Sequence, residues 1–127
     1  MKDVTSFLAS REGRGLLMGD ILRVLLVSMG ALWFPELIAE LEGFRRTLGE
    51  RPPTEAEVSE ALKELAASGL VRIRPGIRAT HRPEGEKTYL VELVKDEAVL
   101  RTIASDERLA KYGRIWDEVM SELRKEE

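Results

Sequence analysis

Apolar side chains recur at helical spacing through the first half of the chain. Nearly every position from Leu16 to Met29 is apolar, which predicts a helix buried on almost all sides, ended by Gly30. Pro35 suits the first turn of a second helix, and apolar residues at steps of three and four extend that helix to Leu48. The pattern therefore predicts two adjacent core helices.

A third helix has its own start and stop signals. Thr54 and Glu57 have the spacing of a capping box, T-x-x-E, in which each side chain bonds the other residue's backbone amide. Apolar residues at helical spacing follow, and Gly69 ends the helix.

The period then changes from helical to two. Over residues 71–82 apolar side chains predominate on one face of the expected strand, whereas the other face carries four arginines and no acid. A turn at Pro83–Glu86 and a returning strand at Thr88–Val94 complete a β-hairpin. Pro75-Gly76 predicts a bulge or an extra bend in its first strand.

The C-terminal part returns to helical spacing. Asp96 and Glu97 begin a short helix, and Ser105 and Asp106 can cap a longer one. The longer helix has an apolar seam of coiled-coil spacing, which we interpret as a homodimer interface; the alternative is packing on its own domain. The seam consists of Leu109, Tyr112, Trp116, Val119, Met120 and Leu123.

The order of these elements has a parallel among known families. The segment TEAEVSEALKELAASGLVRIR, Thr54–Arg74, resembles the recognition helix and first wing strand of the winged helix-turn-helix superfamily, as found in MarR- and PadR-type transcriptional regulators. The resemblance implies a mainly α fold with a small β-hairpin (the wing) and a C-terminal helical extension. Residues 1–95 would form the winged helix-turn-helix domain, with an N-terminal helix before its three-helix core. Residues 96–127 would form C-terminal helices for dimerisation.

Composition excludes several classes of function. The 127 residues suit one compact domain, and without cysteine there is no disulfide, thiolate metal site or cysteine nucleophile. With His81 as the single histidine, we expect no metal, no cofactor and no enzymatic activity. The longest uncharged apolar stretch, Val24–Pro35, is too short to span a bilayer, and no signal peptide is evident, so we expect a cytoplasmic protein without a membrane partner. Asparagine and glutamine are absent and arginine predominates over lysine, a composition that favours a thermophilic source.

Charge is distributed unevenly along the chain. Residues 69–95 carry six positive and three negative side chains, whereas the third helix, Thr54–Ser68, carries four glutamates against Lys63. We therefore expect a DNA-binding transcriptional regulator that contacts duplex DNA mainly through the basic wing. Its expected contact residues are Arg72, Arg74, Arg78, Arg82 and Lys87 from the wing, with Ser59 and Lys63 from the third helix.

Two alternatives remain open at this point. The arginines could form a solvated strand face paired with local glutamates, which would contribute little to stability or binding. The acidic third helix also suits a basic protein partner. The chain would then be a winged-helix protein–protein interaction module in a transcription or replication assembly.

Overall fold

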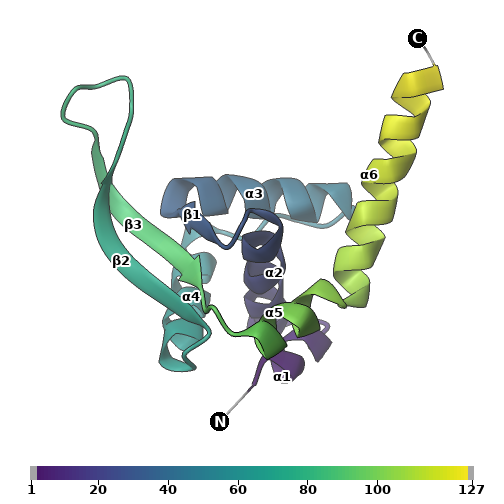
Figure 1. Cartoon of the computed structure of the whole chain (residues 1–127), viewed down its shortest axis with the longest axis horizontal. Helices are drawn as coiled ribbons and strands as arrows, with labels where there is room; N and C mark the ends of the chain where they lie inside the picture. Colours follow the sequence, from purple (N-terminus) through teal and green to yellow (C-terminus); the bar gives the residue numbers. More distant parts are fainter. Residues whose placement is uncertain (1–2, 126–127) are drawn as a thin grey trace.

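A computed structural model describes residues 3–125 and shows six helices and a small antiparallel sheet in that part of the chain (Figure 1). In chain order the elements are α1 (Val4–Ala9), α2 (Gly13–Val27), β1 (Ala31–Trp33), α3 (Phe34–Thr47), α4 (Glu55–Ala67), β2 (Val71–Arg78), β3 (Glu86–Leu93), α5 (Glu97–Ala104) and α6 (Glu107–Lys125). The expected fold class, mainly α with a small β part, is confirmed.

Helix α2 is the centre of the core. Every residue from Leu17 to Leu25 is buried, the charged Asp20 and Arg23 included, and α1, α3, α4 and α5 all pack against this helix. The helix ends where Met29 and Gly30 adopt positive φ angles of 70° and 92°. This reversal directs the chain into β1.

The start of α4 matches the expected capping box. The Glu57 amide donates to Thr54 Oγ1 at 3.1 Å, and the Thr54 amide donates to Glu57 Oε1 at 2.8 Å. The buried face of α4 packs on α2. In chain order α3 and α4 occupy the places of the two helices of the expected helix-turn-helix.

The sheet has the order β1-β3-β2, so β2 is an edge strand. Strand β1, which the sequence pattern did not predict, pairs with β3 from Ala31↔Glu92 to Trp33↔Leu90. Strands β2 and β3 pair in one unbroken register from Val71↔Leu93 to Arg78↔Glu86. The expected bulge at Pro75-Gly76 is therefore wrong.

Pro75 fits the sheet without a bulge because of where its nitrogen points. The Val94 amide donates to the Leu70 carbonyl at 3.0 Å in the hairpin register. Since backbone polar groups alternate sides along a strand, even-numbered residues of β2 bond to β3 and the nitrogen of Pro75 faces the open edge. Gly76 leaves room for the ring of Trp33, because a Cβ there would lie 2.9 Å from Trp33 Cη2.

Helix α6 extends from the helical core on the side opposite the wing (Figure 1). Its first turns pack on the core: Leu109 and Tyr112 are half-buried there, and the rings of Tyr112 and Phe44 have centroids 4.7 Å apart. Its later turns expose Trp116, Val119, Met120 and Leu123. Within residues 3–125 no helix combines the length and hydropathy needed to cross a membrane.

Candidate nucleic-acid interface

The wing, β2 and β3 with their connecting turn, has two chemically different faces. We call the first the arginine face; the register places on it Arg72, Arg74, Arg78, Glu86 and Glu92. We call the second the apolar face; it begins among the core residues Val71, Val91 and Leu93 and continues outward through Ile73, Pro75, Ile77, Tyr89 and Lys87. Both faces have a net charge of one positive unit. On the arginine face three arginines are offset by two glutamates, whereas on the apolar face Lys87 is the one charged residue that β2 and β3 place there.

Ion pairs between strands neutralise much of the arginine face. Arg74 Nε lies 2.6 Å from Glu92 Oε1, and Arg78 Nη1 lies 3.2 Å from Glu86 Oε2. Arg72 is exposed and has no carboxylate within 4.0 Å among the described residues. To contact a phosphate, Arg74 and Arg78 would therefore have to break their ion pairs with the glutamates, or bind the glutamate and the phosphate at the same time.

The outer end of the wing carries cations without such partners. Arg82 lies in the turn, where the Gly85 amide donates to its carbonyl at 3.1 Å, and its side chain is exposed. Lys87 is exposed on the apolar face, directly opposite Ile77. Within residues 3–125 neither cation forms an ion pair.

Large apolar side chains are exposed beside Lys87. Ile77 is 62% exposed and Tyr89 is 55% exposed, although both lie on the face whose inner end is buried in the core. With Pro75 and Thr88 they line a shallow hollow of about 460 Å³. The apolar pattern of the wing thus extends well beyond what the core can cover.

The solvent face of α4 is acidic. Ser59 is half-buried, and Lys63 is exposed but bonded to Glu60 Oε1 at 3.1 Å. Hydrogen bonds from the backbone and hydroxyl of Thr54 hold the pKa of Glu57 below its usual value, so this carboxylate stays ionised. The two predicted α4 contacts therefore lie in a negatively charged surface.

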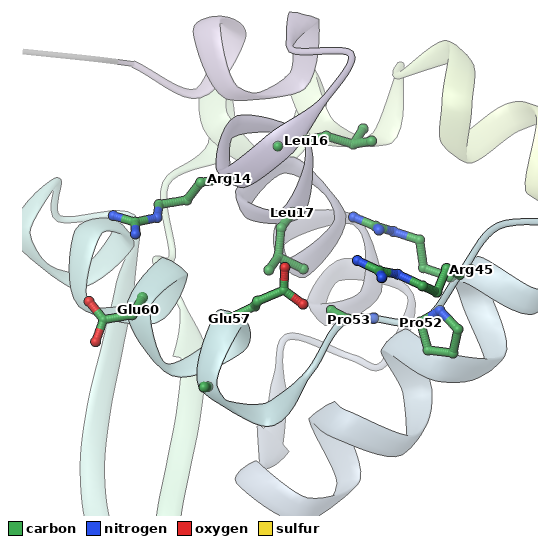
Figure 2. Close-up of a pocket in the computed structure, with 11 residues that line it drawn as sticks. Arg14, Leu16, Leu17, Arg45, Pro52, Pro53, Glu57 and Glu60 are labelled. Carbon is green, nitrogen blue, oxygen red and sulfur yellow. The ribbon is translucent and has the colours of Figure 1, made fainter.

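A pocket of about 520 Å³ lies between α2, α4 and the link that joins α3 to α4 (Figure 2). Figure 2 shows the Glu57 carboxylate directed toward Leu17, with Arg45 on the other side. Two of the charged residues that line this pocket already form hydrogen bonds within the protein. Arg45 Nε bonds Asp20 at 2.6 Å, and Glu57 caps α4.

Sequence reasoning missed a partly buried network of charges at the base of α6. Six side chains with three positive and three negative charges join α2, α3, the α3–α4 link and α6. They are Asp20, Arg23, Arg45, Glu50, Asp106 and Arg108. We call this set the arginine–carboxylate network.

Two arginines connect the elements in this network. Arg23, only 1% exposed, bonds Asp20 at 2.7 Å, Asp106 at 2.5 Å and the Leu8 carbonyl at 2.8 Å. Arg108 bonds both carboxylate oxygens of Asp20 and both of Glu50. Because Asp106 also accepts from the Leu109 amide at 2.9 Å, the network fixes the first turn of α6 to the core.

The network stabilises the charged forms of its members. Hydrogen bonding from Arg108 lowers the pKa of Glu50. Burial opposes ionisation of Asp106, but hydrogen bonds from Arg23 and the Leu109 amide outweigh it and lower the pKa of this carboxyl. Burial likewise opposes the charge on Arg108, yet hydrogen bonds to Glu50 and Asp20 raise its pKa above the usual value.

The described residues contain no group of three or more histidine or acidic side chains placed to hold a metal ion. His81 is exposed near the tip of the wing.

Comparison with solved structures supports the fold. The chain is similar to part of the Orc1 protein of Aeropyrum pernix in complex with DNA, with a TM-score of 0.54 and 23% identity over 77% of this chain. The match spans only 26% of that longer protein. A candidate transcriptional regulator from Thermoplasma acidophilum has a TM-score of 0.50 and 18% identity, covering 88% of this chain and 97% of that one. At these identities the likeness shows a winged-helix fold.

No protein-family model and no curated protein sequence matches the chain. The specific resemblance to MarR- and PadR-type regulators therefore stays a prediction.

Proposed function

We propose that this protein binds duplex DNA and regulates transcription, with the wing supplying most of the contact. The observation that carries the proposal is a winged-helix fold whose projecting hairpin has exposed cations without acidic partners among residues 3–125. The two solved structures described above are consistent with this function, since one is a DNA complex and the other a candidate transcriptional regulator. Positive side chains on such a projection bind phosphates and release counterions.

The wing cations contribute unequally in this proposal. Arg72, Arg82 and Lys87 are exposed and without an ion-pair partner in the described part of the chain, so a phosphate can bind them without displacing a glutamate. Arg74 and Arg78 contribute less, because each is paired with a glutamate. Ser59 and Lys63 are secondary contacts, since the surrounding glutamates repel the duplex.

A second copy of the chain is the expected partner of α6. Leu109 and Tyr112 already pack within their own chain, so the proposed dimer seam consists of Trp116, Val119, Met120 and Leu123. Sedimentation equilibrium of Trp116→Glu tests this seam; the expected result is a monomer where the wild type is a dimer.

The proposed function is tested by fluorescence anisotropy with a 30-base-pair duplex over a series of salt concentrations. The variant Arg72→Ala/Arg82→Ala/Lys87→Ala removes the unpaired wing cations and leaves no glutamate without its partner. The slope of log affinity against log salt is negative, and its magnitude is expected to be smaller in this variant than in the wild type by between about 1 and 3.

A control variant removes the same number of positive charges from outside the wing. Arg101→Ala/Arg114→Ala/Arg124→Ala lies on α5 and on α6, the helix opposite the wing (Figure 1), and is expected to keep the wild-type slope within about 0.5. The proposal fails if the wild type does not bind at low salt, or if this control lowers the slope as much as the wing variant.

The acidic face of α4 favours one alternative, a protein-interaction module with a basic partner. Charge reversal at Glu55→Lys/Glu60→Lys separates the two. If α4 lies against DNA, removing this repulsion raises DNA affinity at least tenfold at low salt. An unchanged affinity would favour a protein partner for this helix.

A further inference from the structure

The two faces of the wing offer DNA different chemistry. The arginine face is charged, but ion pairs with glutamates neutralise two of its three arginines. The outer half of the apolar face exposes Ile77, Tyr89 and Pro75 around Lys87, with no acid on that face of either strand. We propose that the apolar face, not the arginine face, is the side of the wing that packs against DNA.

Exposure of the apolar residues is the first argument. Val71 and Val91 on the same face are buried, whereas Ile77 and Tyr89 are more than half exposed. Leaving two large side chains in water costs free energy that burial against a partner would recover. Pro75 directly opposes Tyr89 across the hairpin, so these side chains form one continuous patch.

Charge is the second argument, and it selects the kind of partner. A DNA backbone alternates charged phosphates with less polar deoxyribose, and the grooves expose base edges beside it. Lys87 directly opposes Ile77, and Arg82 lies in the turn between β2 and β3, so unpaired positive charge borders the apolar patch. A patch that combines an aromatic ring, aliphatic groups and unpaired cations matches sugar and phosphate together.

Geometry is the third argument. The inner end of the apolar face packs on the helical layer, where α4 contacts β2. The outer end of that face is therefore turned to the same side of the sheet as the helix-turn-helix. The arginine face is turned the other way, where the Trp33 ring lies against Gly76.

This inference rests on the proposed DNA binding, and its test separates the two. Affinity for the same 30-base-pair duplex is measured across the salt series for Tyr89→Ala, Ile77→Ala, Lys87→Ala and Arg72→Ala. Tyr89→Ala is expected to weaken binding roughly tenfold with the salt slope unchanged, because an apolar contact releases no counterion. Lys87→Ala is expected to lower the slope by about 0.9.

Arg72→Ala is the comparison on the opposite face: it removes one unpaired cation and is expected to weaken binding less than Lys87→Ala does. Arg101→Ala on α5, outside the wing, is the control and is expected to change affinity less than threefold. Circular dichroism and thermal unfolding check the fold of each variant. Each is expected to keep the wild-type fold, because Ile77 and Tyr89 are exposed and outside the core. Wild-type binding that Tyr89→Ala and Ile77→Ala leave unchanged would overturn the inference and leave the proposed function standing. An Arg72→Ala effect larger than that of Lys87→Ala would assign the contact to the arginine face instead. A wild type that binds no DNA would refute both.

Discussion

Two groups of arginines in this protein have opposite environments. Arg23, Arg45 and Arg108 lie at the junction of α2, α3 and α6, where carboxylates and one carbonyl accept their hydrogen bonds. Arg72 and Arg82 project from the wing and form no ion pair in the described structure. The same side chain thus fixes helices together in one region and stays available to a ligand in the other, and burial with pairing decides between the two roles.

Among the tests of this contrast, the loss of a buried arginine is expected to have the largest effect on stability. Arg23→Met would leave Asp20 and Asp106 without their shared partner in the interior, and we expect the free energy of unfolding to fall by about 3–5 kcal/mol. The wing counterpart Arg72→Met should change it by less than about 0.5 kcal/mol. Urea unfolding measures both, and equal losses would contradict the division into two groups.

A charge-conserving substitution asks whether geometry matters as much as charge. Arg108→Lys keeps the positive charge, but one ammonium group cannot reproduce the paired bonds to Asp20 and Glu50. We expect a loss of about 1–3 kcal/mol in unfolding free energy. Arg82→Lys in the wing is the control and should leave both stability and DNA affinity close to wild type.

Acid should weaken the buried group selectively. The pKa values of Asp106 and Glu50 are lowered by folding from ordinary values of 3.8 and 4.5, so their contribution to stability is complete above those values. It is lost as the pH falls below them toward the folded-state values. Urea midpoints between pH 7 and 3 should therefore decline at the acid end, and Asp106→Asn should make the decline shallower. A decline as steep in Asp106→Asn as in wild type would show that other groups cause it.

The smallest effect is expected at the ion pairs of the wing. Arg74 and Glu92 are 48% and 25% exposed at their side chains, so solvent screens their attraction. A double-mutant cycle with Arg74→Ala and Glu92→Ala should give a coupling below about 1 kcal/mol in stability. A coupling as large as that of the buried group would mean that the wing arginines are structural as well.

The sequence was sufficient to predict elements whose signals are local. The capping box of α4, the apolar length of α2 and the alternation in β2 each depend on neighbouring residues, and the structure contains all three. Strand β1 was not predicted because three residues carry no periodicity, and the strand exists only through pairing with β3.

The arginine–carboxylate network shows a second limit of sequence reasoning. Asp20 and Arg23 interrupt an otherwise apolar stretch of the sequence, yet both lie inside the buried helix α2. Opposite charges three residues apart in a helix that is apolar all round must be paired, and this signal could have predicted burial. Their partners Asp106 and Arg108 are more than 80 residues away, and no local pattern connects them.

Pro75 has a consequence for the behaviour of the protein in concentrated solution. An edge strand with a full row of free amide groups is a template on which strands of other molecules can add, leading to aggregation. The Pro75 nitrogen faces the open edge of β2 and carries no proton, so an incoming strand would lose a hydrogen bond in the middle of the edge. Pro75 therefore disfavours the pairing of β2 with strands of other molecules, although the hairpin is exposed.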